Sequence, residues 1–168
     1  EVLSVSLGYR PAAPVNISIT SSEPTSVEPS VSQLSFTPAN YDQAQAVSLN
    51  ILEDIDLANE TVDISFSDGT VSAVTTVSVT DNDTQALVLS SSRINLDEGS
   101  NGSVTVSLAH QPASNVTVNI NIPGGLVGVN PSSLIFTPNN FSQAQTLTLE
   151  ANHDANTVDD TENVALSA

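Results

Sequence analysis

The stretch FTPANYDQAQAVSLNILED, residues 36–54, returns as FTPNNFSQAQTLTLEANHD at residues 136–154. Nine of the nineteen positions are identical, and most of the others exchange one residue for a similar one. The match extends outward, because LSVSLGYRPAAPVNISI (3–19) aligns with VTVSLAHQPASNVTVNI (104–120). A duplication of this length predicts two copies of one module, with residues 1–83 forming the first copy and residues 84–168 the second.

Apolar residues alternate with serine, threonine and other polar residues through most of both copies. Val47, Leu49 and Ile51 in the first copy show the pattern, as do Leu147 and Leu149 in the second. A period of two residues is typical of strands with one buried and one solvated face. Proline and glycine separate the short runs, as in two-sheet folds. The sequence therefore predicts an all-β chain of two tandem immunoglobulin-like antiparallel β-sandwiches.

The two copies are incomplete at opposite ends. The first has no counterpart of residues 86–99, the expected first strand of the second copy. The second has no counterpart of residues 71–83, the expected last strand of the first copy. Trimming of a longer chain would explain this pattern. The alternative is strand exchange, in which a neighbouring chain supplies the missing strand and builds a fibre.

The composition excludes several classes of function. Nineteen acidic residues stand against Arg10 and Arg93, with no lysine, which gives a net charge of −17. Nucleic-acid binding depends on Lys and Arg, so it is excluded, and anionic membrane surfaces are disfavoured. No apolar run is long enough to insert into a membrane. The acidity suits an extracellular or cell-surface location. Because cysteine is absent, a bound metal is the remaining common way to reinforce a small core.

Acidic residues gather where strands are expected to end. The candidate metal ligands are Glu53, Asp54, Asp56, Glu60, Asp81, Asp83, Glu98 and Asp154. In an extended chain Asp81 and Asp83 point to the same side, about 6.6–6.8 Å apart, and can bracket one ion. At about 4 Å and an effective dielectric constant near 20, each like-charged pair costs roughly 4 kcal/mol. Calcium takes oxygen ligands and relieves this cost, so we predict a Ca²⁺ site; solvated loop acids are the alternative.

Three segments resemble known families. VNPSSLIFTPNNFSQ (129–143) is similar to repeats of giant bacterial surface adhesins, whereas ILEDIDLANETVDISFS (51–67) and VSVTDND (77–83) resemble Calx-β domains. The resemblance implies immunoglobulin-like sandwiches in tandem arrays, with calcium at one end of each sandwich. The implied ligands are an early-loop Glu, an acidic pair after a middle strand and acidic residues that end the last strand.

These implied ligand positions correspond to Glu53, Asp54, Asp81 and Asp83 in the first copy and, less closely, to Asp56 and Glu60. The early Glu corresponds to Glu98, which lies in the second copy. That copy also keeps Asp154, with Asp159 and Asp160 nearby, but has His153 where an acid is expected.

The resemblance implies an extracellular spacer or stalk repeat of a surface adhesin, stiffened by calcium at the junction between modules. Its partners would be neighbouring copies of the module in an array or fibre, with glycans or surface proteins contacted through other parts of the parent. One alternative is a filament subunit joined by strand exchange. Another is a carbohydrate-binding module that uses Tyr9, Tyr41 or Phe141. Catalysis is not expected, because His110 and His153 have no counterparts in the other copy and no catalytic motif occurs.

Overall fold

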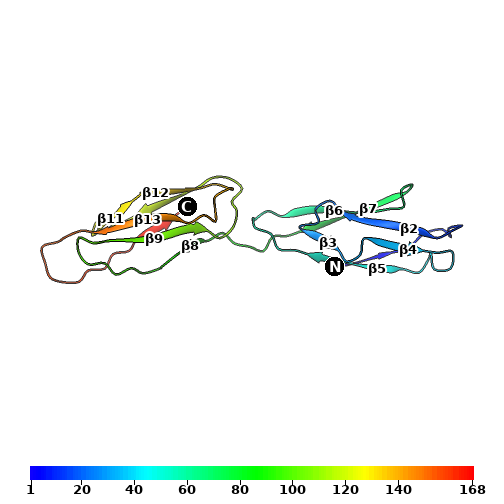
Figure 1. The fold of residues 1–168 in the computed structure, drawn as a ribbon, viewed down its shortest axis with the longest axis horizontal. Coiled ribbons are helices and arrows are strands. Elements are labelled where there is room, and N and C mark those ends of the chain that lie inside the picture. The colour runs from blue at the N-terminus through cyan, green and yellow to red at the C-terminus, as the bar shows by residue number, and fades with distance from the viewer. The chain divides into compact units, whose positions relative to one another are not determined.

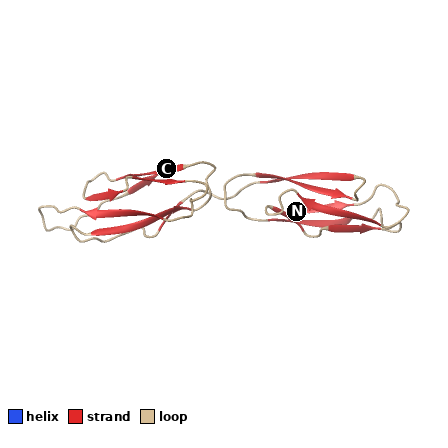
Figure 2. Cartoon of the chain, turned by 45° about the horizontal axis from the view of Figure 1, so that its top comes forward, coloured by secondary structure: helices blue, strands red, loops and turns tan.

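The computed structural model describes residues 1–168 and contains strands β1 to β14 and no helix (Figures 1 and 2). All pairings between strands are antiparallel. This arrangement confirms the predicted all-β, sandwich-type fold. The structure contains no helical segment with the length and hydrophobicity that a membrane crossing requires.

The chain divides into two compact units. The first comprises Glu1–Asp54 and Ala58–Asp81, and the second comprises Ile55–Leu57 and Asn82–Ala168. Each unit contains two antiparallel sheets and a hydrophobic core of its own. Each of the two repeats in the sequence thus supplies most of one unit.

The first unit has one sheet with strand order β4-β2-β6-β7 and a second with order β1-β5-β3. Its strands are β1 (Val2–Val5), β2 (Val15–Ser21), β3 (Val27–Pro29), β4 (Gln33–Phe36), β5 (Gln45–Ile51), β6 (Glu60–Ser67) and β7 (Ser72–Val79). Both sheets contribute to the core, in which the side chains with no exposed surface are Val27, Phe36, Val47, Val62 and Ile64.

The second unit has one sheet with strand order β11-β13-β9-β8 and a second with order β12-β10-β14. Its strands are β8 (Leu87–Leu89), β9 (Asn101–Leu108), β10 (Val116–Asn121), β11 (Val127–Asn130), β12 (Ser133–Phe136), β13 (Gln145–Ala151) and β14 (Ala165–Ser167). Val106, Val118 and Phe136 have no exposed surface in its core.

The alternation in the sequence appears directly in the burial of the strands. In β5, Val47 and Leu49 are buried and the residues on either side of them are exposed. In β13, Leu147 and Leu149 take the same places. Burying each such side chain contributes about 1.5–3 kcal/mol, whereas the Ser and Thr side chains between them face water. The stabilisation that each core provides is therefore the sum of small contributions from many Val, Ile and Leu residues.

The repeated Thr-Pro-x-Asn segment forms the same turn in both units. The Asn40 side-chain oxygen accepts hydrogen bonds from the Thr37 backbone N–H at 2.6 Å and from the Thr37 hydroxyl at 2.8 Å. Asn140 accepts the corresponding bonds from Thr137 at 2.6 and 3.0 Å. The sequence repeat thus preserves a hydrogen-bonded turn.

The glutamine that follows this turn links the two sheets of each unit. Gln45, in β5, donates through Nε2 to the Ser35 carbonyl in β4 at 2.8 Å. Gln145, in β13, donates to the Ile135 carbonyl in β12 at 2.7 Å. In each case the two strands belong to different sheets. The repeated Gln-Ala-Gln segment is therefore a structural link across the corner of the sandwich.

The two units differ at the edges of their sheets. In the second unit β9 has partners on both sides, β13 and β8, whereas β1 of the first unit pairs with β5 alone. In the first unit β6 lies between β2 and β7, whereas β14 pairs with β10 alone. The strand expected in residues 86–99 is short, because β8 ends at Leu89 and a turn follows, in which Ser91 Oγ donates to the Arg93 carbonyl at 2.6 Å.

Candidate metal centre

The pairing of β6 with β7 determines which acidic residues of the first repeat meet. In this hairpin Glu60 lies opposite Val79. The loop that precedes β6, residues 52–59, therefore lies beside the segment that follows β7. A hydrogen bond of 2.8 Å from the Asp81 backbone N–H to Asn59 Oδ1 links the two segments.

Three of the predicted ligands come together at this place. One carboxylate oxygen from each of Asp54, Asp56 and Asp81 lies within 4.8 Å of the other two. Asp54 is exposed, whereas Asp56 and Asp81 are half-buried. Like charges held this close repel one another, and partial burial reduces the screening by water. A cation bound among the three would relieve that repulsion.

The chemistry and the spacing of this acidic triad fit one divalent cation. Oxygen ligands about 2.3–2.6 Å from a calcium ion lie no more than about 5.2 Å apart. The three carboxylate oxygens meet that limit. All three are hard oxygen donors, which suit calcium and magnesium better than metals that prefer sulfur or imidazole. The triad could therefore hold a metal ion.

The other predicted ligands of the first repeat lie outside the triad. Glu53 is exposed, and Glu60 is the first residue of β6. Strand β7 ends at Val79, so Asp81 and Asp83 both lie beyond the strand. Asp81 joins the triad, whereas Asp83 contacts His110, with 3.2 Å between Asp83 Oδ2 and His110 Nδ1.

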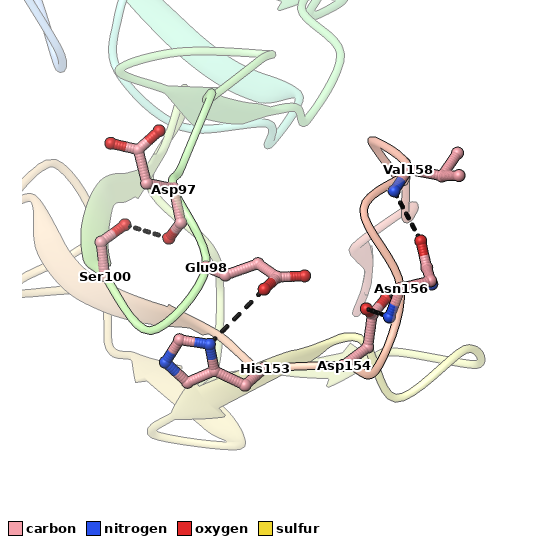
Figure 3. Close-up of polar contacts among 7 residues, drawn as sticks. All are labelled: Asp97, Glu98, Ser100, His153, Asp154, Asn156 and Val158. Atoms are coloured by element: carbon pink, nitrogen blue, oxygen red, sulfur yellow. Dashed lines mark hydrogen bonds and ion pairs between the residues drawn. The ribbon is translucent and has the colours of Figure 1, made fainter.

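Glu98 and Asp154, the predicted ligands of the second repeat, make contacts of a different kind (Figure 3). Glu98 Oε2 lies 3.4 Å from His153 Nδ1. Both carboxylate oxygens of Asp154 accept hydrogen bonds from Asn156, one from its backbone N–H and one from its side chain, each at 2.8 Å. Asn156 in turn accepts a bond from the Val158 N–H at 2.6 Å. Local bonds thus shape the loop around Asp154.

Asp160 belongs to the same group of acids. A hydrogen bond with Asp154 raises the pKa of the Asp160 carboxyl above its usual value, and partial desolvation and the charges of Asp154, Glu98 and Asp159 act in the same direction. Asp160 is therefore harder to ionise in the folded repeat than in the unfolded chain.

The aromatic residues considered for sugar binding have different surroundings. Phe141 packs against the core of the second unit, and its carbonyl accepts a hydrogen bond from the Leu108 N–H at 2.8 Å. The Tyr41 carbonyl accepts the corresponding bond from the Leu7 N–H at 2.7 Å. Tyr9, in contrast, is 91% exposed. The matching places of Tyr41 and Phe141 favour a structural role for this pair.

Glu162 lies outside the predicted set, although it makes an unusual number of contacts. Its carboxylate accepts hydrogen bonds from the backbone N–H groups of residues 124–127. Because the donors are backbone groups, no side-chain motif marks them. The one available signal is the Pro-Gly-Gly sequence at residues 123–125, which indicates a tight turn.

Comparison with known proteins adds no relative of this chain. No protein-family model matches it, and no curated protein matches it either.

Proposed function

We propose that the chain is part of an extracellular spacer or stalk of a surface adhesin, built from tandem sandwich repeats that bind calcium. The observation that carries this proposal is the meeting of Asp54, Asp56 and Asp81 within 4.8 Å. The resemblance of residues 51–67 and 77–83 to Calx-β domains and the net charge of −17 support it further. Repetition of the turn and of the core, without a repeated set of chemically active side chains, favours a mechanical role over a catalytic one.

Calcium suits the triad better than magnesium does. Calcium accepts six to eight oxygen ligands in flexible geometry, so backbone carbonyls and water can complete a site that begins with three carboxylates. Magnesium requires near-ideal octahedral geometry at shorter distances and is seldom held by a site made of protein groups alone. The exposed position of Asp54 leaves room for water ligands.

An ion at the triad would connect the loop before β6 to the segment after β7. Asp81 also lies close in sequence to the start of the second repeat, so the ion would restrict the chain where it leaves the first repeat. At free calcium about a hundredfold above Kd, one site stabilises the folded state by about 2.7 kcal/mol. We propose that this restriction stiffens the array.

Thermal melting and isothermal titration calorimetry test the proposal. In excess calcium, the melting temperature should lie several degrees above its value in EDTA, and magnesium at the same concentration should have a smaller effect. The variant Asp56→Asn should lose most of the calcium-dependent shift. Asp63→Asn is the matched control, because Asp63 is an exposed acid on β6 outside the triad. An equal loss in both variants, or a shift of a degree or less in the unaltered protein, would refute the calcium site.

A filament subunit joined by strand exchange is the second candidate. The observation that favours it is that β1 and β14 are edge strands, while their counterparts β9 and β6 have partners on both sides. An edge with unpaired backbone groups accepts an additional strand readily. Light scattering over a range of concentrations tests this candidate. Growth of the particle mass with concentration would support it, and a monomer throughout the range would contradict it.

A further inference from the structure

The turn between β10 and β11 in the second repeat provides four N–H groups to one carboxylate. The donors are the backbone N–H groups of Gly124, Gly125, Leu126 and Val127, and the acceptor is Glu162. Each carboxylate oxygen takes two of these bonds; the bonds from Gly125, Leu126 and Val127 measure 3.0, 2.6 and 3.1 Å. Successive N–H groups that point to one place form an anion-binding concavity. Here the occupant is a side chain of the same molecule.

The carbonyl groups of the same turn hold Asn152. The Asn152 backbone N–H donates to the Leu126 carbonyl at 2.9 Å, and its side-chain amide donates to the Gly125 carbonyl at 2.9 Å. Asn152 and Glu162 flank the loop of residues 153–161, which contains no strand. Both ends of this loop are therefore attached to one turn. Asn152 binds the carbonyl groups of the turn, and Glu162 binds its N–H groups.

The loop between these two attachments is rich in negative charge. It carries Asp154, Asp159 and Asp160, and its only basic candidate is His153. Repulsion among these carboxylates opposes a compact loop, and the attachments at its two ends act against that repulsion.

Gly124 lies directly against the Glu162 carboxylate. A Cβ atom added at Gly124 would meet Glu162 Oε1, so the carboxylate would have to shift to make room for it. Gly125, the next residue, adopts φ +73°, the left-handed conformation that favours glycine. The two glycines thus have separate roles, since one gives the carboxylate room and the other allows the turn.

We propose that residues 124–127 form a carboxylate-binding site that Glu162 occupies, and that this contact latches the acidic loop 153–161 onto the second repeat. Glu162 is then a positioning residue, which holds the C-terminal end of this loop on the turn. The latch consists of protein groups alone. The proposal therefore goes beyond the proposed function and holds whether or not the first repeat binds calcium.

Amide hydrogen exchange measured by NMR in EDTA tests the latch. In the variant Glu162→Ala, the amides of residues 124–127 should exchange faster by on the order of tenfold, the factor expected when a hydrogen bond to a charged acceptor is lost. The heteronuclear NOE of loop residues such as Ala155 should fall, which reports a more mobile loop. Amides of β13 should stay protected, which shows that the unit remains folded.

Two further variants separate the latch from a general loss of order. Gly124→Ala should displace the carboxylate, so that the same amides exchange faster, though by no more than in Glu162→Ala, and it should add nothing in the Glu162→Ala background. Asp159→Asn removes the same charge from the loop and should leave the four amides unchanged. The proposal is overturned if those amides exchange equally fast in the unaltered protein and in Glu162→Ala, or if Asp159→Asn has the same effect as Glu162→Ala.

Discussion

The two repeats share a similar arrangement of strands, but the acidic loop at one end of each makes different contacts. In the first repeat, the loop before β6 places Asp54 and Asp56 next to Asp81, so carboxylates face one another. In the second repeat, the longer loop before β14 is attached to the turn at residues 124–127 through Glu162. The two loops therefore differ in what surrounds their carboxylates. In the first, three carboxylates gather where a cation could bind, and in the second, backbone N–H groups satisfy one carboxylate.

The largest loss of stability is expected from substitutions in the two cores, where the repeats are most alike. Phe36 and Phe136 occupy equivalent places and have no exposed surface. Phe36→Ala and Phe136→Ala should each destabilise the unit concerned by about 3–5 kcal/mol, because each leaves a cavity in a core made of small side chains. Urea unfolding followed by circular dichroism measures both. A loss below about 1 kcal/mol in one variant alone would mean that the two cores are packed differently.

Calcium should distinguish the acidic loop of the first repeat from that of the second. Both tyrosines, Tyr9 and Tyr41, lie in the first unit, so tyrosine fluorescence reports its unfolding selectively. Saturating calcium should move the fluorescence transition by the equivalent of about 2.7 kcal/mol at a hundredfold excess over Kd, because Asp54 and Asp81 belong to the first unit. Asp81→Asn should abolish this shift, whereas Asp154→Asn, in the other acidic loop, should leave it unchanged. An equal loss of the shift in both variants would show that the two acidic loops are equivalent after all.

Substitutions in the repeated turn should cause an intermediate loss of stability, of equal size in both units. Asn40→Ala and Asn140→Ala each remove an acceptor from two bonds, and each should lower the free energy of unfolding by about 1–3 kcal/mol because a half-buried N–H loses its partner. Asn→Asp at either place keeps the acceptor and should cost less. If Ala and Asp variants are equally destabilised, the hydrogen bonds are not the reason for the repeated asparagine.

The smallest effect concerns the charge on Asp160. Its pKa is raised in the folded state, mainly through Asp154, so it stabilises the fold while protonated and that contribution is lost as pH rises through the folded-state pKa. Asp160→Asn should therefore slightly raise the melting temperature at pH 7. Below the unfolded-state pKa the substitution should have little effect, because Asp160 is then protonated in both states. Asp42→Asn, at an exposed site in the first unit, is the control. If Asp160→Asn raised the melting temperature at acidic pH alone, the pKa of Asp160 could not be raised in the folded state.

Most of the fold could be predicted from the sequence, because side chains on a strand alternate between two faces and Val47 and Leu49 reveal that period directly. The candidate site could be predicted only as a set of eight acids. Which of them meet depends on the register of β6 against β7, and a shift of two residues would preserve the same alternation. The latch could not be predicted, because the partners of Glu162 are backbone groups more than thirty residues away.

The turn at Thr137–Asn140 also bears on covalent modification. Asn140-Phe141-Ser142 has the form of an acceptor sequence for N-linked sugars, whereas the equivalent Asn40-Tyr41-Asp42 does not. Asn140 is half-buried, and its Oδ1 accepts two hydrogen bonds from Thr137. A sugar is joined to Nδ2, which neither of these bonds uses. In a host that glycosylates its secreted proteins, an oligosaccharide at Asn140 would therefore leave the acceptor of this turn in place, and it would mark the second repeat alone.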